Sequence, residues 1–153
     1  MSILRWIGLL AIVIVCWTAL RQQVSTPPAD PTAGHATTSS SATIDALTQA
    51  ERVADWLVQH QRLPDFYLTK AAARRQGWEP DKGNLCEVLP GRAIGGDRFS
   101  NCEQQLPRQA GRQWYEADVN YRCGRRGADR LIYSSDGLIY LTRDHYRSFR
   151  KVH

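Results

Sequence analysis

The chain has 153 residues, which is room for one domain of ordinary size and leaves none for a large multidomain assembly. Its formal net charge is +5, and 17 of its 20 basic residues are arginine, whose planar guanidinium group matches phosphate oxygens. This charge favours a polyanionic partner, although a high arginine content can also reflect the base composition of the genome. The four cysteines include no C-x-x-C pair, so a zinc site is not expected.

The N-terminal segment, residues 1–21, has the features of a signal peptide or a signal anchor. A charged start (Met1–Arg5) precedes fifteen apolar or small residues (Trp6–Leu20), and Arg21 follows. This run suits the apolar region of a signal peptide and is short for a membrane span, which needs about 20 residues. No small-x-small cleavage site follows directly, so a cleaved signal and a membrane anchor through residues 6–20 both remain open. Either alternative predicts export, with a secreted or periplasmic domain.

Residues 22–43 are dominated by Ser, Thr, Pro, Ala and Gly, with almost no large apolar side chain. Such a segment cannot offset its ordering entropy by burial, so we predict a flexible linker. His35 lies in it without companions, and no metal role is expected for it. The folded domain is therefore predicted to span residues 44–153.

A first helix is predicted after Thr48, because Thr48 and Glu51 match a capping box in which Thr48 is the N-cap. Apolar residues then recur on one side of the helix, which should end before Leu63-Pro64. We interpret His60 as a helix-end residue, since its neighbours offer no catalytic chemistry.

Two shorter helices are predicted next. Thr69 can cap a helix from Lys70 to Gln76, and Gly77 supplies its left-handed stop. Asn84–Val88 could form one or two further helical turns. Lys70 falls in a first helical turn, where the helix dipole does not favour a cation, which hints at a use for its charge. The alternative is an ordinary solvated lysine.

The C-terminal part is predicted to form strands. Alternation from Trp114 to Tyr121 indicates a strand with one polar and one apolar face. Arg130–Ser135 and Leu138–Thr142 are rich in β-formers and meet across Asp136-Gly137, the dipeptide typical of a type I′ hairpin turn. Helices followed by antiparallel strands predict an α+β fold. From the residues alone, Glu116 is best interpreted as a solvated residue on the polar face.

Several blocks of sequence occur in an order that points to one family. RLPDFYLTK, KGNL and PGRAIGGDRFSN are followed by WYEADVNYRCGRRGADRLIYSSDGLIYLTRDHY. Together, over about Val53–Val152, they resemble the small bacterial guanyl-type ribonucleases, the barnase-like family. The resemblance implies the microbial ribonuclease fold, with N-terminal helices packed on a C-terminal antiparallel β-sheet. It also gives chemistry to Asp144-His145-Tyr146, which would otherwise be interpreted as a polar loop.

The resemblance implies a catalytic set for RNA cleavage without a metal or a cofactor. Glu116 would be the general base and His145 the general acid. Unperturbed pKa values of about 4.3 and 6.5 allow an ionised glutamate beside a protonated histidine in mildly acidic solution. Lys70, Arg126 and Arg130 would surround the phosphate, and the two arginines would share a face if both were extended. The products would be a 2′,3′-cyclic phosphate and then a 3′-phosphate.

The resemblance also implies a guanine pocket, and hence cleavage of single-stranded RNA 3′ to guanosine or to purines. Asp97 would hold Lys70 or Glu116, and Tyr146 would stack beside the bound base. The other substrate-binding residues implied are Phe99, Ser100, Asn101 and Glu103. Backbone amides and the glutamate would read the base edge. This chain has Cys102 where the family usually has arginine, and the lost cation should weaken binding of phosphate and of an acidic inhibitor.

Three cysteines fall in the predicted domain, so at most one internal bridge forms and one thiol stays free. On the family fold Cys86 and Cys123 lie close together, so the resemblance implies that pair, and Cys86–Cys102 is the alternative. A bridge that closes a loop of about 38 residues should stabilise the domain by roughly 2–4 kcal/mol.

The resemblance implies RNA as substrate and a barstar-like acidic protein inhibitor in the producing cell, where the active enzyme would be toxic. Nothing in the sequence suggests an obligate oligomer, so a monomer is expected. Two alternatives remain open. One is a non-catalytic RNA- or partner-binding module on the same fold, and the other is an antibacterial ribonuclease toxin, which differs only in delivery.

Overall fold

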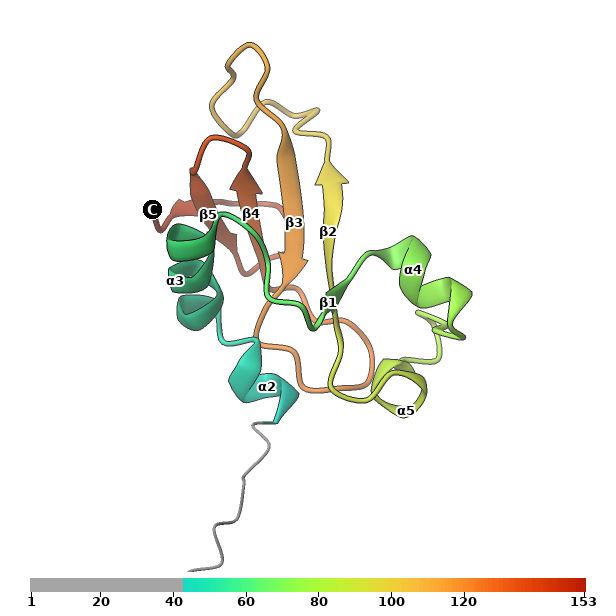
Figure 1. Cartoon of the computed structure of the whole chain (residues 1–153). Helices are drawn as coiled ribbons and strands as arrows, with labels where there is room; N and C mark the ends of the chain where they lie inside the picture. Colours follow the sequence, from blue (N-terminus) through green and yellow to red (C-terminus); the bar gives the residue numbers. More distant parts are fainter. Residues whose placement is uncertain (1–42) are drawn as a thin grey trace, which may run out of the picture. The chain divides into compact units, whose positions relative to one another are not determined.

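The computed structural model of the chain describes residues 43–153, and Figure 1 shows how their elements are arranged. The predicted signal or anchor segment and nearly all of the predicted linker, including His35, lie outside the described residues. Within the described part, no helix combines the length and the apolar character that crossing a membrane requires.

The helices in residues 43–153 are α2 (Ile44–Leu47), α3 (Ala50–His60), α4 (Lys70–Arg75) and α5 (Leu85–Val88). α3 buries one side of its surface in the main core, through Ala50, Val53, Ala54 and Leu57. It ends at His60, because Gln61 takes a left-handed conformation. The predicted end before Leu63-Pro64 is therefore confirmed.

The predicted capping box at the start of α3 is wrong. Thr48 is fully buried, and its hydroxyl donates to the carbonyl oxygen of Ile44 at 2.8 Å and accepts from the N–H of Tyr121 at 3.0 Å. The first amide of α3, that of Ala50, donates to the side-chain oxygen of Asn120 at 3.2 Å. The capping-box pattern gave a wrong prediction because groups 70 or more positions away along the chain compete for the same hydrogen bonds.

The two shorter helices begin where the sequence predicted. The hydroxyl of Thr69 accepts from the N–H of Ala72 at 3.3 Å, and Gly77 has a φ of 95° just beyond the end of α4. This cap fixes Lys70 in the first turn of α4. α5 lies within the predicted Asn84–Val88.

The strands follow the helices and pair in chain order. They are β1 (Tyr67–Leu68), β2 (Ala93–Phe99), β3 (Trp114–Asp118), β4 (Arg130–Ser134), β5 (Ile139–Thr142) and β6 (Arg150–Lys151). β1 runs parallel to β2, and every other neighbouring pair is antiparallel. A mainly antiparallel sheet combined with mostly N-terminal helices confirms the predicted α+β class.

Both faces of this sheet are covered. On one face Ala117 and Leu131 pack with α3 in the main core. On the other face Trp114 and Ile132 pack beneath side chains from the loops that follow β2 and β5. Glu116 points to this second face and is only 5% exposed, so the solvated position predicted from the residues alone is wrong.

The predicted strand from Trp114 to Tyr121 is shorter than expected. β3 ends at Asp118, and Asn120 has a φ of 52°, which no strand residue adopts. The amide of Val119 still donates to the carbonyl oxygen of Asp129, at 3.3 Å. The chain therefore leaves the sheet to form the loop of residues 119–129.

The hairpin between β4 and β5 is confirmed, but its turn is not type I′. That turn needs a positive φ at both central residues, whereas in Asp136-Gly137 only the glycine has one, of 95°. The N–H of Gly137 donates to the carbonyl oxygen of Ser134 at 3.2 Å, and the N–H of Ser134 donates to that of Leu138 at 2.9 Å. These bonds describe a longer turn with Gly137 at its bulge position.

A β-bulge in β2 sets the register beside Glu116. Asp97 pairs with Glu116, whereas Gly95 pairs with the next residue of β3, so Gly96 is an extra residue. Gly96 has a φ of 91°, and a Cβ on Gly95 would lie 2.7 Å from the ring of Tyr67. The two glycines therefore allow the bulge that brings Asp97 opposite Glu116.

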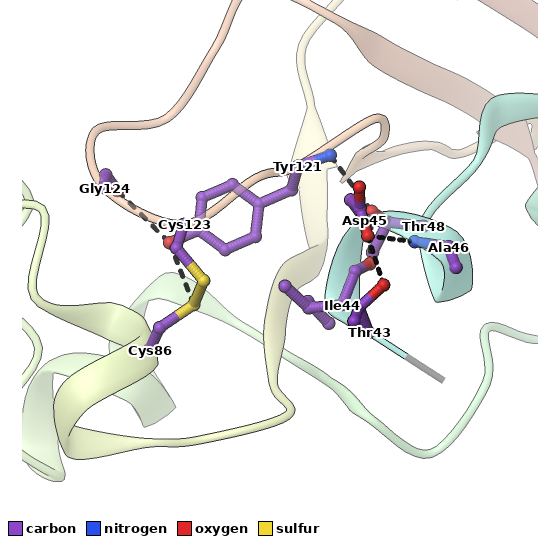
Figure 2. Close-up of a disulfide and its surroundings, with 9 residues drawn as sticks. All are labelled: Thr43, Ile44, Asp45, Ala46, Thr48, Cys86, Tyr121, Cys123 and Gly124. Atoms are coloured by element: carbon purple, nitrogen blue, oxygen red, sulfur yellow. Dashed lines mark hydrogen bonds between the residues drawn. A yellow bond between two sulfur atoms is a disulfide. The ribbon is translucent and has the colours of Figure 1, made fainter. Parts of the chain in front are cut away.

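A disulfide joins Cys86 of α5 to Cys123 in the loop after β3 (Figure 2). This is the pair that the family resemblance implies. Cys102, the partner in the alternative pairing, is exposed and is the free cysteine of the described residues. The disulfide fastens the loop that carries Arg126 to α5.

Candidate active site

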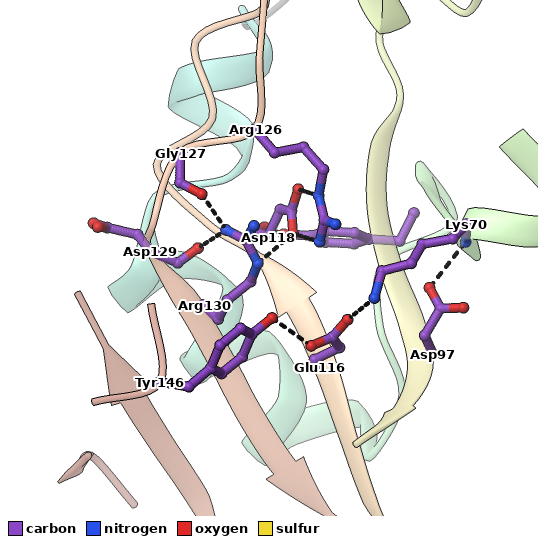
Figure 3. A network of polar contacts seen from close by, with 10 residues as sticks. Lys70, Asp97, Glu116, Asp118, Arg126, Gly127, Asp129, Arg130 and Tyr146 are labelled. Atoms are coloured by element: carbon purple, nitrogen blue, oxygen red, sulfur yellow. Dashed lines mark hydrogen bonds and ion pairs between the residues drawn. The ribbon is translucent and has the colours of Figure 1, made fainter. Parts of the chain in front are cut away.

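Glu116 lies at the centre of a cluster of polar side chains on one face of the sheet (Figure 3). The ammonium group of Lys70, from the first turn of α4, forms an ion pair with Oε1 of Glu116. The hydroxyl of Tyr146, from the loop after β5, donates to Oε2 at 2.6 Å. Each carboxylate oxygen is therefore held from a different part of the chain.

These contacts decide the charge of the carboxylate. Burial disfavours the ionised form, but the hydrogen bonds from Lys70 and Tyr146 and the charge of Lys70 outweigh burial and lower the pKa of Glu116. Burial and the neighbouring Glu116 raise the pKa of Tyr146 to about 12. At neutral pH the site thus contains an ionised carboxylate and a protonated phenol.

Asp97 orients Lys70 through the backbone. Its Oδ2 accepts a hydrogen bond from the N–H of Lys70 at 2.9 Å, which satisfies one of the free amides at the start of α4. Of the two roles expected for Asp97, contact with Lys70 or with Glu116, the hydrogen bond goes to Lys70. The β-bulge in β2 allows this hydrogen bond between Asp97 and Lys70, because it places Asp97 opposite Glu116.

Arg126 and Arg130 are held together by a residue that sequence reasoning missed, Asp118. Arg126 binds both oxygens of Asp118 at 2.6 Å, and Nε of Arg130 lies 2.8 Å from Oδ1 (Figure 3). Burial disfavours the Arg126 cation, but the hydrogen bond and charge of Asp118 outweigh burial and raise the pKa of Arg126. Arg126 lies in a loop, so the two arginines share Asp118 rather than one extended face. Asp118 follows Glu116 at the strand period of two, a signal that could have identified it.

His145 lies in a tightly braced turn after β5. His145 and Tyr146 have φ values of 56° and 69°, which non-glycine residues rarely adopt. Asp144 holds the turn, because its carboxylate accepts from Thr142, from Ser148 and from two backbone amides at 2.5–3.1 Å. The imidazole itself is exposed, and its ring centre lies 4.9 Å from that of Tyr146. Sequence reasoning missed this role of Asp144.

A cavity of about 230 Å³ adjoins this cluster. Its lining includes every predicted substrate-binding residue apart from Asp97, namely Phe99, Ser100, Asn101, Glu103 and Tyr146. The rings of Phe99 and Tyr146 are stacked, with their centres 5.5 Å apart. Tyr146 thus lines the cavity and also contacts the carboxylate of Glu116. We call this cavity the base pocket.

The polar side chains of the base pocket differ in how far their polar atoms are already used in hydrogen bonds within the protein. The amide group of Asn101 is occupied, because it donates to the carbonyl oxygen of Leu106 at 2.8 Å and accepts from its N–H at 3.0 Å. Asn101 therefore shapes the loop. Glu103 is exposed, and its Oε2 accepts from Gln105 at 2.6 Å. Cys102, also exposed, places its sulfur 3.1 Å from the hydroxyl of Ser100.

Comparison with known proteins identifies the family of the chain. A family model described as ribonuclease matches residues 32–153. The chain is 46% identical to a ribonuclease of Bacillus pumilus over 156 residues, which cover 99% of this chain and 96% of that protein. The chain belongs to the ribonuclease family. A ribonuclease of Heyndrickxia coagulans is 58% identical over 100 residues, covering 65% of this chain and 92% of that protein.

Membership of the ribonuclease family confirms the barnase-like resemblance and the microbial ribonuclease fold. A ribonuclease of Bacillus intermedius, 45% identical over 99% of this chain, supports the same conclusion. The family implies RNA as the substrate class. Among residues 43–153, no group of three or more His, Cys, Asp and Glu side chains is placed to hold a metal ion.

Proposed function

We propose that the chain is an exported endoribonuclease that cleaves single-stranded RNA 3′ to guanosine, or to purines, without a metal ion. The reaction has two steps, transphosphorylation to a 2′,3′-cyclic phosphate and hydrolysis to a 3′-phosphate. Glu116 is the general base and His145 the general acid of the first step. Lys70, Arg126 and Arg130 stabilise the charge that develops on the phosphate.

In the first step Glu116 removes the proton of the 2′-hydroxyl, and the 2′-oxygen attacks the adjacent phosphorus. A P–O2′ bond forms while the P–O5′ bond breaks, and the departing 5′-oxygen takes a proton from His145. In the second step the roles reverse. His145 then removes a proton from water, which attacks phosphorus, and Glu116 returns a proton to the leaving 2′-oxygen.

The lowered pKa of a buried Glu116 is the observation that carries this proposal. A buried carboxylate is normally driven towards its neutral form, and here Lys70 and Tyr146 keep it ionised and able to accept a proton. Tyr146 lines the base pocket and also donates a hydrogen bond to the carboxylate of Glu116, so this carboxylate lies beside the pocket. A nucleotide whose base fills the pocket would therefore present its ribose towards Glu116.

The base preference rests on the base pocket. Aromatic rings of Phe99 and Tyr146 supply a stacking surface, and the exposed carboxylate of Glu103 can accept hydrogen bonds from a guanine edge. Cys102 supplies no cation at the rim of this pocket. We therefore expect guanine preference to persist and the affinity for phosphate to be lower than with arginine there.

Export is proposed from residues 1–21, which act as a signal peptide or as a membrane anchor, with residues 22–43 as the linker to the ribonuclease domain of residues 44–153. The domain would then work in a secreted or periplasmic location, as a monomer. A barstar-like acidic inhibitor would protect the producing cell, and the positive net charge of the chain suits such a partner.

Cleavage of short RNAs that differ in one base tests the proposal, using the full chain with EDTA present and with the ends of the products identified. We expect a cyclic phosphate to form 3′ to guanosine at a rate that EDTA does not change. Uncleaved RNA that remains bound would instead identify a non-catalytic binding module.

A further inference from the structure

A second cavity borders the base pocket and has no role in the proposed reaction. It has a volume of about 530 Å³, a size typical of small-molecule sites. Its walls are the end of β2 and the loop of residues 100–113 that leads to β3, at the top of Figure 1. It shares one wall with the base pocket, formed by Phe99, Ser100, Asn101 and Cys102.

Among residues 43–153, the lining of the second cavity includes three arginines and no carboxylate. Arg112 is already neutralised, because it donates three hydrogen bonds to Asp136 at 2.6–3.0 Å. Within the part of the chain that the structure describes, Arg108 donates only to the neutral side-chain oxygen of Gln104, at 3.1 Å. Arg98 is exposed and forms no ion pair within residues 43–153. Arg98 and Arg108 therefore leave two positive charges uncompensated in a concave site.

The position of the catalytic groups indicates which phosphate can reach this cavity. Under the proposed function, the nucleotide in the base pocket has its 3′-phosphate at Glu116, on the side where Tyr146 lines the pocket. The second cavity contains no residue of the Tyr146 loop and adjoins the wall from Phe99 to Cys102. Of the two phosphates of this nucleotide, the 5′-phosphate is therefore the one that can enter the second cavity.

We propose that Arg98 and Arg108 form a subsite for the phosphate on the 5′ side of the nucleotide whose base is bound. This subsite rests on the proposed function, because it needs a base in the neighbouring pocket. A concave cavity that shares a wall with the base pocket fits one phosphate of an RNA chain better than the broad surface of an acidic protein. The planar guanidinium groups of Arg98 and Arg108 would bind its oxygens through charge-assisted hydrogen bonds.

Binding calorimetry on the full chain tests the subsite with two nucleotides. Guanosine 3′,5′-bisphosphate carries the 5′-phosphate, and guanosine 3′-monophosphate lacks it. We expect the bisphosphate to bind about tenfold more tightly at low ionic strength, since two partly exposed charge contacts together are worth about one factor of ten. The double variant Arg98→Gln and Arg108→Gln should reduce this ratio to about one. Arg52→Gln, at an exposed position of α3, should leave the ratio unchanged.

The remaining outcomes separate the subsite from the proposed function. Equal affinities in the unmodified chain, or an unchanged ratio in the double variant, would overturn the subsite and leave the base pocket intact. Failure of both nucleotides to bind would overturn the base pocket and the subsite together. Inorganic phosphate should not displace the bisphosphate at similar concentrations, and displacement would show a free-phosphate site instead.

Discussion

Glu116 and Lys70 form an ion pair at the centre of the candidate site, and this pairing makes the pH dependence of the proposed reaction testable. Under the proposed mechanism Glu116 must be ionised to act, so its lowered pKa should place the acidic limb of the kcat/KM profile at a lower pH than an unperturbed glutamate would give. Burial alone would move that limb in the opposite direction.

Glu116→Gln removes the base and is expected to lower kcat by a factor on the order of 10²–10⁴. Lys70→Ala leaves Glu116 buried but removes a hydrogen bond that favours its ionised form, so the acidic limb of kcat/KM should move to higher pH. Lys82→Ala is the matched control, because among the described residues Lys82 pairs only with the exposed Glu79. An acidic limb that stays in place in Lys70→Ala would disprove this account of the Glu116 pKa.

Asp144 allows a second test, of stability rather than rate. Hydrogen bonds, chiefly from Ser148, lower the pKa of Asp144 to about 2. The folded value lies below the unfolded value of about 3.9, so its ionised form stabilises the fold above pH 4 and loses this effect as the pH falls through about 2. Asp144→Asn should therefore lower Tm at pH 6, with a difference from the unmodified chain that shrinks towards pH 2.

The control for Asp144→Asn is Asp81→Asn, an exposed position outside the braced turn, which should leave Tm unchanged across the same range. Thermal unfolding followed by circular dichroism gives both profiles. A Tm difference for Asp144→Asn that is independent of pH would show that its carboxylate does not brace the turn through its charge.

For single residues, the sequence predicts the candidate catalytic groups better than it predicts the carboxylates that hold those groups in position. The family resemblance supplied Lys70, Glu116 and His145 as candidates, and the first two are in contact. Asp118 was not found, although it shares the strand face of Glu116, because its role as a partner of Arg126 and Arg130 depends on how the following loop folds back. The partners of Asp144 are its near neighbours in sequence, such as Ser148, and their pattern does not differ from that of an ordinary polar loop.

Among the elements, local signals predicted helix ends where no distant group competes. Thr69 and Gly77 bound α4 as their residue types predict. Thr48 has an equally good local pattern, but its hydroxyl is used by Tyr121, so the pattern failed. The same limit applies to Asp136-Gly137, whose dipeptide predicts a turn but not its length.

The disulfide is the element-scale feature with the largest expected effect on stability. Replacing both Cys86 and Cys123 by serine should lower the free energy of unfolding by about 2–4 kcal/mol, because the bond closes a loop with a sequence separation of 37 in the unfolded chain. Urea unfolding measures this change. Cys102→Ser removes the free thiol of the described residues and should leave the free energy of unfolding unchanged. An equal loss in both proteins would exclude the disulfide as the cause.

For the whole molecule, the site depends on three parts of the chain meeting on one sheet face. α4 supplies Lys70, β3 supplies Glu116 and the loop after β5 supplies Tyr146. The α+β class was predictable because helical and strand periodicities occupy different halves of the domain. The burial of that face was not, since the loops that cover it show no periodic pattern.

In the proposed reaction Glu116 removes the proton of the 2′-hydroxyl and His145 protonates the departing 5′-oxygen. Turnover of the 4-nitrophenyl ester of guanosine 3′-phosphate, compared with turnover of RNA, separates these two roles, because 4-nitrophenoxide leaves without a proton. We expect Glu116→Gln to lose a factor on the order of 10²–10⁴ in kcat on both substrates, and His145→Ala to lose as much on RNA but only about tenfold or less on the ester. Equal losses for His145→Ala on the two substrates would contradict this role of His145.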